Sequence, residues 1–174
     1  MDNILAISIN SDGIMDDIRG RFKLKNDEVK EPEFYLGAKL KKKEINGRAC
    51  WTIPSVDYLK AAIQTVKNAI KGTNRRLIPK AKTPMTTSYH PEMDGTPELN
   101  EKDLALYQEL IGILRWSTEI GRVDILFEVS ILSQHLACPR EGHLGQVLHI
   151  FSYLENKPKL TLYMVTYSQY CTTV

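Results

Sequence analysis

Three amphipathic segments between residues 100 and 154 constrain the fold of this chain more than any other feature. Apolar residues recur along each segment at steps of three and four, so they share one face of a helix. Short breaks at Gly121 and Pro139 favour packing between sequence neighbours, and the sequence therefore predicts a three-helix block. The three stripes are Leu104, Tyr107, Leu110, Ile111 and Leu114; Ile125, Val129, Leu132 and Leu136; and Leu144, Val147, Leu148, Phe151 and Leu154.

The boundaries of these helices have recognisable signals. Asn100 can cap the first helix, and Asp103, three residues on, is placed to complete a capping box. Gly121 is expected to end that helix. The second helix should stop before Pro139, which is expected to open the third.

The chain before residue 54 is predicted to contain mostly strands. Residues 4–9 form a short apolar run typical of a buried strand, and residues 34–40 suit a second one. Asn46 and Gly47 can both adopt positive φ, so they predict a tight hairpin turn before a return strand at 49–53. Ser11 is expected to cap a short helix between the first two strands.

Another helix is predicted from about Val56 to Ile70, after Pro54 and Ser55. An irregular but ordered connector should follow at 79–100, because this range holds four prolines. Residues 160–165 suit a final strand. The predicted fold class is therefore α+β, a small antiparallel hairpin region followed by a mainly helical region. In the helix predicted from about Val56 to Ile70, the buried face would hold Leu59, Ala62, Ile63, Val66 and Ile70.

Composition is that of an ordinary soluble domain, with 43% hydrophobic and 25% charged residues. No apolar run approaches about 18 residues, so neither a membrane span nor a secretory signal is expected. The three cysteines form no CxxC pair and indicate free thiols in a reducing compartment. We therefore expect an intracellular protein, cytoplasmic or nuclear and not secreted.

Charge is distributed very unevenly along the chain. Residues 39–82 hold twelve Lys/Arg against two Asp/Glu, a net of +10, whereas residues 1–38 hold five against eight and residues 83–174 six against eleven. A basic middle between acidic flanks indicates either a polyanion-binding surface or solvated lysines on an ordinary surface. The candidate nucleic-acid contacts are Lys39, Lys41, Lys42 and Lys43 on or beside the hairpin, and Lys60, Lys67 and Lys71 along the helix after it.

Other chemistry-bearing residues have structural interpretations. His135, Cys138, His143 and His149 invite a zinc site, but His143 and His149 are six apart on a predicted helix and cannot converge easily. Capping or core roles are favoured for them. Arg122 and Asp124 are expected to pair at a turn rather than catalyse. Trp51 and Trp116 could stack on bases, although core positions are favoured.

Several short motifs follow one another in a specific order: Met1-Asp2-Asn3-Ile4-Leu5, Phe34-Tyr35-Leu36-Gly37, Thr83-Pro84-Met85, Tyr107-Gln108-Glu109-Leu110-Ile111-Gly112 with Leu114, and Arg122-Val123-Asp124-Ile125. His143 and Tyr153-Leu154 fit the next helix. From Met1 to about Leu162 this order resembles the C-terminal part of a copia-type retrotransposon reverse transcriptase. The first motif is similar to the Y-x-D-D box of that family.

The resemblance implies an arrangement of domains and a chemistry. Residues 1–53 would be a palm remnant, 54–99 a thumb-like helix with its connector, 100–156 a helical connection and 157–174 a terminal strand with a truncated tail. The family uses Mg²⁺ held by three palm carboxylates for RNA-directed DNA synthesis. Its partner is an RNA/DNA template–primer duplex, which the basic residues would contact through phosphates.

The metal-binding box departs from the family pattern. Asp2 occupies the first aspartate position, but Asn3 replaces the second, and a neutral amide supplies no negative charge to a divalent cation. Asp2 is thus the only candidate catalytic and Mg²⁺-binding residue, and Mg²⁺ is not expected to bind this chain alone. We expect a fragment of a retrotransposon polyprotein that is inactive without a missing N-terminal polymerase half. The alternatives are a non-catalytic nucleic-acid-binding module and a helical interaction or scaffold protein.

Overall fold

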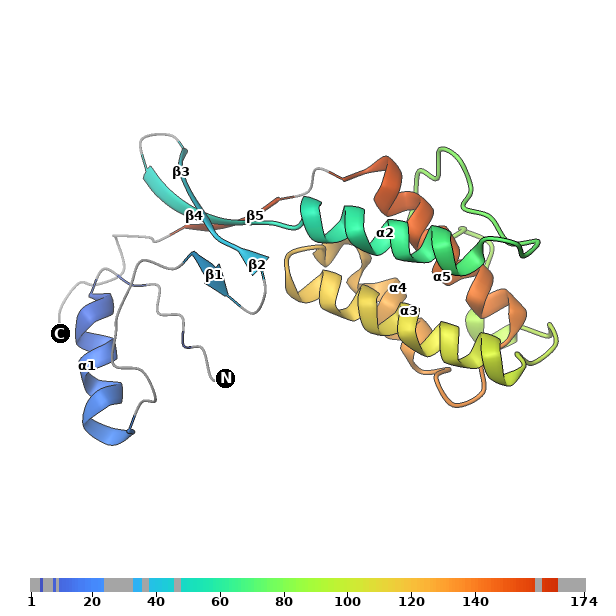
Figure 1. Ribbon diagram of the computed structural model, residues 1–174, viewed down its shortest axis with the longest axis horizontal. Coiled ribbons are helices and arrows are strands. Elements are labelled where there is room, and N and C mark those ends of the chain that lie inside the picture. The colour runs from blue at the N-terminus through green and yellow to red at the C-terminus, as the bar shows by residue number, and fades with distance from the viewer. Residues whose placement is uncertain are drawn as a thin grey trace. The chain divides into compact units, whose positions relative to one another are not determined.

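The computed structural model describes residues 4, 8, 10–23, 33–35, 38–45, 48–158 and 161–165 (Figure 1). The chain divides into two compact units, one of residues 1–54 with 162–174 and one of residues 55–161. The described residues combine helices with antiparallel strands, which confirms the predicted α+β class. None of the described helices has the length and apolarity needed to cross a membrane.

The first unit contains α1 (Ser11–Arg21), β1 (Phe34–Tyr35), β2 (Ala38–Lys39), β3 (Lys41–Ile45), β4 (Arg48–Pro54) and β5 (Thr161–Val165), the last from Leu162 onward. The second contains α2 (Val56–Ile70), α3 (Glu101–Glu119), α4 (Leu126–Ser133) and α5 (Glu141–Asn156), with 3₁₀ turns η1 (Pro91–Met93) and η2 (Val123–Ile125).

The strands of the first unit form a two-stranded and a three-stranded sheet. In the larger sheet the order is β3-β4-β5, so the predicted final strand joins the predicted hairpin. Ile45 lies opposite Arg48, which leaves two residues for the turn predicted at Asn46 and Gly47; these two are outside the described residues. The single strand predicted at 34–40 is wrong, because β1 and β2 pair with each other antiparallel. The sequence places Gly37 between them, and glycine favours a chain reversal.

Helix α1 begins with a different cap from the predicted one. Asn10, not Ser11, is the N-cap, and its side-chain oxygen accepts from the Gly13 N–H at 3.0 Å. A side chain at Gly13 would approach Asn10 within 2.5 Å, so glycine permits this cap. No α1 residue is buried, and its C-cap residue Phe22 is 66% exposed. The strand predicted at 4–9 lies mostly outside the described residues.

The core of the second unit is one cluster shared by four helices and η2. Helix α2 has the predicted bounds and the predicted buried face. Its apolar stripe packs with those of α3, α4 and α5, so the three-helix block gains a fourth member. The buried Tyr107 hydroxyl donates to the Leu132 carbonyl at 2.7 Å, which ties α3 to α4.

The predicted start of α3 is confirmed, whereas its capping box and the predicted start of α5 are wrong. Asn100 caps α3 as predicted, accepting from the Asp103 N–H at 3.0 Å, but the Asp103 carboxylate accepts from Arg75 instead of completing a capping box. A charge-assisted bidentate bond from Arg75 is stronger than the single bond that the carboxylate would accept from the cap backbone. Helix α5 starts at Glu141 rather than at Pro139, because the Pro139 carbonyl accepts from Leu99 and residue 140 bridges to residue 98.

The connector between α2 and α3 is irregular, as predicted, and is fixed to α5 at several points. The Ile78 N–H donates to Ser152 Oγ at 2.8 Å. His149 Nε2 lies 3.0 Å from the Thr83 carbonyl, and His143 Nε2 lies 3.0 Å from the Pro91 carbonyl. Both rings must donate there because a carbonyl only accepts. The two histidines thus have the core and capping roles favoured by the sequence, and Cys138 is exposed.

Arg122 is a fully buried cation, and it pairs at the turn as predicted. Its guanidinium makes two bonds to the Asp124 carboxylate at 2.9 and 2.8 Å and donates to the Lys157 carbonyl at 2.8 Å. Tyr153 donates to the same carboxylate at 2.9 Å. Burial raises the pKa of Asp124, but the bonds from Arg122 and Tyr153 outweigh this, and the net shift is downward.

The two tryptophans are half-buried and do not belong to the core cluster, so the favoured core assignment is wrong. Trp51 lies opposite Lys42 in the β3–β4 register, and the Lys42 Nζ atom lies 5.6 Å from the centre of its ring. An exposed cation over an aromatic face contributes about 0.5–1 kcal/mol.

Stability should fall in two stages on acidification. Burial, followed by electrostatic repulsion from His143, lowers the pKa of His135 below its ordinary value, against the opposing charges of Asp94 and Glu92. Folding therefore favours neutral His135, and stability decreases as pH drops from about 6.5 toward the folded pKa. The lowered carboxyl pKa values of Asp103 and Asp124 add a steeper loss below about pH 4.

Urea unfolding between pH 7 and pH 3 measures this dependence. The variant His135→Asn should lose the first stage and keep the second, because an amide does not titrate. Equal stability of the parent chain at pH 7 and pH 5 would contradict the assignment to His135.

Candidate functional site

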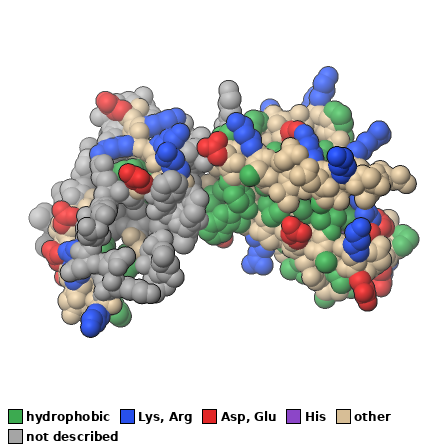
Figure 2. Space-filling model, viewed as in Figure 1, with side chains coloured by type: hydrophobic (Ala, Val, Ile, Leu, Met, Phe, Trp, Pro, Cys, Tyr) green, Lys and Arg blue, Asp and Glu red, His purple; other side chains and the backbone are tan. Residues whose placement is uncertain are grey.

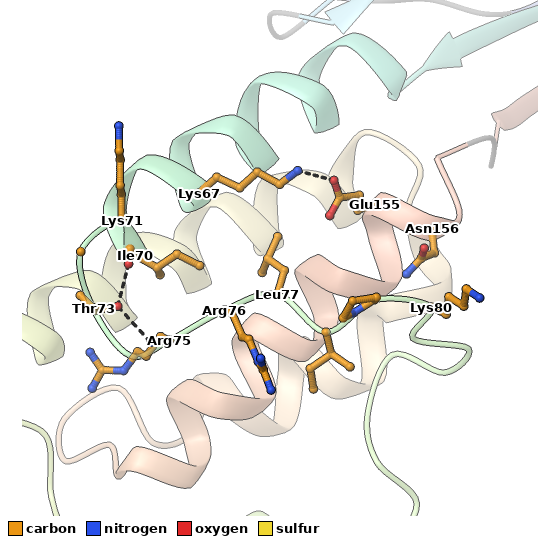
Figure 3. Close-up of a pocket in the computed structure, with 13 residues that line it drawn as sticks. Lys67, Ile70, Lys71, Thr73, Arg75, Arg76, Leu77, Lys80, Glu155 and Asn156 are labelled. Atoms are coloured by element: carbon orange, nitrogen blue, oxygen red, sulfur yellow. Dashed lines mark hydrogen bonds and ion pairs between the residues drawn. The ribbon is translucent and has the colours of Figure 1, made fainter.

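A basic groove lies on the second unit between the end of α2, the start of the connector and the end of α5 (Figure 3). Its volume is about 680 Å³. Five of its lining residues are cations and one is an anion: Lys67, Lys71, Arg75, Arg76 and Lys80 against Glu155. The lining therefore has an excess of four positive charges.

The groove forms because the chain turns sharply after α2. Gly72 adopts a left-handed φ of 83°, which glycine tolerates without cost. Thr73 then closes the turn, since its N–H and its hydroxyl both donate to the Ile70 carbonyl, at 3.0 and 2.7 Å. The connector returns along α5, where Leu77 packs on the core. Lysines at the helix end and basic residues of the connector therefore border the same hollow.

Two of the five cations are neutralised within the protein. Arg75 donates to both oxygens of Asp103 and to both oxygens of Glu141, all within 3.0 Å, so it joins the connector to the starts of α3 and α5. These bonds raise the pKa of Arg75 despite partial burial. Lys67 pairs with Glu155 across the groove.

The other three cations are available to a ligand. Lys71, Arg76 and Lys80 are exposed, and no ion pair found among the described residues includes them. Lys80 has a left-handed φ of 63°, a conformation that is strained for a lysine. In Figure 3, Lys71, Arg76 and Lys80 point in different directions around the groove. Cations that point in different directions suit an extended polyanion with several phosphates better than one small anion.

Of the predicted lysines along α2, Lys67 and Lys71 line the groove and Lys60 does not. Lys60 and Lys67 are exposed on α2 and Lys71 is exposed at its C-cap, and Figure 2 shows basic side chains projecting over that helix. Sequence reasoning missed Arg76 and Lys80, because they lie outside any helical stripe. The only signal for them was the high positive charge of residues 39–82 as a whole.

The predicted hairpin lysines belong to the first unit and do not share one face. Lys42 lies opposite Trp51, whereas Lys41 and Lys43 lie opposite Thr52 and Cys50, on the other face of the sheet. Lys39 pairs in register with Phe34 on the smaller sheet. All four lysine side chains are exposed.

The predicted metal-binding residue cannot be placed, because Asp2 and Asn3 lie outside the described residues. Within the described ranges, no three histidine, cysteine or carboxylate side chains gather as metal ligands would. The donor set at the N-terminus is one carboxylate and one neutral amide, which does not fit a pair of Mg²⁺ ions.

Comparison with known proteins gives one informative similarity. The chain is 32% identical over 124 residues to the Saccharomyces cerevisiae protein named "Putative transposon Ty5-1 protein YCL074W". This chain is similar to a transposon protein. The aligned region covers 71% of the chain and 37% of that protein, so the chain spans well under half the length of the relative. No protein-family model matches the chain, and no solved structure matches it.

Proposed function

We propose that the chain is a fragment of a retrotransposon polyprotein, related to a copia-type reverse transcriptase, that binds an RNA/DNA duplex without copying it. The similarity to a transposon protein supports the origin. The order of motifs from Met1 to about Leu162 supports the reverse transcriptase assignment, in which the second unit corresponds to thumb and connection.

The basic groove is the observation that carries the binding function. Lys71, Arg76 and Lys80 are exposed around it, and Lys60 extends the positive surface along α2. Phosphates of a duplex are spaced regularly and carry one negative charge each, so several separated cations can contact several phosphates at once. Such contacts position the duplex but do not distinguish its bases. We therefore propose binding that depends on salt and not on sequence.

The proposed absence of synthesis depends on the N-terminal box. Asn3 stands at the position of the second aspartate, and an amide oxygen lacks the charge that holds two divalent cations close together. The chain alone should therefore hold a duplex without extending it.

Fluorescence anisotropy with a labelled RNA–DNA hybrid tests the binding function. We expect saturable binding to hybrids of two unrelated sequences with affinities that agree within about threefold, since phosphate contacts read no sequence. A strong preference for one sequence would contradict phosphate-based binding. Absence of binding at low salt would favour the interaction or scaffold alternative.

A primer-extension assay with Mg²⁺ tests the absence of synthesis. The expected result is no incorporation by the parent chain or by the variant Asn3→Asp, because one restored carboxylate does not complete the family's set of three. Incorporation by the parent chain would overturn the proposal that it is inactive, and it would leave the binding function unaffected.

A further inference from the structure

A second hollow on the helical unit lies between the connector and the start of α4, with a volume of about 530 Å³. Its character is opposite to that of the basic groove. No lysine or arginine lines it, and its walls combine apolar side chains with two carboxylates. Its apolar side chains include Met85, Pro91, Phe127 and Ile131, and its two carboxylates are Glu92 and Glu128.

The apolar part of this hollow extends onto exposed surface. Phe127 is 70% exposed on α4, and Val123 and Leu126, close to it in the sequence, are each more than half exposed. An exposed aromatic side chain such as Phe127 at the wall of a hollow is typical of protein-binding surfaces.

The acidic part contains an unsatisfied group. Glu128 Oε2 is buried and has no hydrogen-bond partner among the described residues. A buried carboxylate oxygen without a donor is unfavourable, and a partner's cation placed beside the same carboxylate would reduce that penalty. The hollow also holds Glu92, whose carboxylate lies 3.4 Å from the His90 ring. The charge at this site therefore complements a basic ligand and repels nucleic acid.

The connector wall of the hollow is already fixed before any partner arrives. Gln146 Oε1 accepts from both the N–H and the hydroxyl of Thr86, and His149 holds the Thr83 carbonyl. The Tyr89 hydroxyl donates to the Asp94 carboxylate. Little free energy would therefore be lost in ordering this surface when a partner binds.

From these observations we propose that the hollow is a docking site for a basic amphipathic segment of another protein. An apolar side chain of that segment would pack on Phe127 and Ile131, and a neighbouring lysine or arginine would pair with Glu128. The proposal is independent of the basic groove, which binds ligands of the opposite charge.

The substitution Glu128→Gln gives a distinctive signature. In the free chain it should leave the melting temperature unchanged or raise it, because it removes the negative charge from a carboxylate whose Oε2 has no donor. Binding of a basic segment should weaken on the order of tenfold, because the ion pair is lost. The matched control is Glu109→Gln, an exposed carboxylate on α3, which should change neither quantity. A lower melting temperature for Glu128→Gln would overturn the proposal, since Glu128 would then have an internal role.

The probe is a short labelled peptide of leucine and lysine in helical spacing, with two matched peptides that carry glutamate for lysine or serine for leucine. In fluorescence anisotropy, only the peptide of leucine and lysine should bind to the chain. The variant Phe127→Ser should bind that peptide more weakly than the parent chain does. In ¹⁵N–¹H spectra of the full chain that peptide should shift amides at 83–92 and 127–131. Shifts confined to other residues would overturn the proposal. Shifts at these residues caused by increasing protein concentration, or by a nucleic-acid duplex, would also overturn it.

Discussion

Replacing Arg122 with alanine is expected to lower the free energy of unfolding by about 3–5 kcal/mol, the largest effect of any single charge removal in the helical unit. The guanidinium is fully buried and holds the Asp124 carboxylate and the Lys157 carbonyl together. Removing it leaves a carboxylate with little solvent and only the Tyr153 hydroxyl as a strong donor. The loss is therefore mainly the penalty of an unpaired charge.

Urea unfolding followed by circular dichroism measures this loss. Arg115→Ala is the control, because Arg115 is exposed on α3, and it should change stability by less than about 0.5 kcal/mol. The pKa of the Asp124 carboxyl should also rise in Arg122→Ala, since the guanidinium is a main cause of its lowering. A loss below about 1 kcal/mol would mean that water or another donor replaces the guanidinium, against this description of the site.

The second large effect concerns the groove. The triple variant Lys71→Gln, Arg76→Gln, Lys80→Gln should bind an RNA–DNA hybrid on the order of a hundredfold more weakly at about 0.1 M salt, because three phosphate contacts and their released counterions are lost. Glutamine keeps most of each side chain's length, so the fold should be unaffected. A matched triple, Lys102→Gln, Arg115→Gln, Lys157→Gln, removes the same charge from exposed positions that do not line the groove. It should weaken binding much less, and equal losses would mean that overall charge, and not the groove, determines affinity.

The helical unit was largely predictable because its helices are strongly periodic. The bounds of α2 and its buried face follow from apolar spacing alone, and the partner of Arg122 is only two residues away. Local signals were less reliable where two groups competed for one role. Asn10, and not Ser11, is the cap of α1, and the Asp103 carboxylate accepts from the side chains of Arg75 and Asn100 and not from the Asn100 backbone.

The groove could not be predicted in full because it depends on contacts between distant segments. Arg76 and Lys80 carry no periodicity, and they reach the end of α2 only because Gly72 reverses the chain and Ser152 holds the connector at Ile78. The role of Glu128 could not be predicted either, since only the folded structure shows that its Oε2 atom is buried without a hydrogen-bond partner. Spacing in the sequence cannot reveal either arrangement.

The salt dependence of hybrid binding tests the central claim most directly. The logarithm of the dissociation constant, plotted against the logarithm of KCl concentration, should be steep for the parent chain. The triple variant of Lys71, Arg76 and Lys80 should have a slope smaller by about three, close to one for each cation removed. Parallel lines for the two proteins would contradict the claim that these three residues contact phosphates.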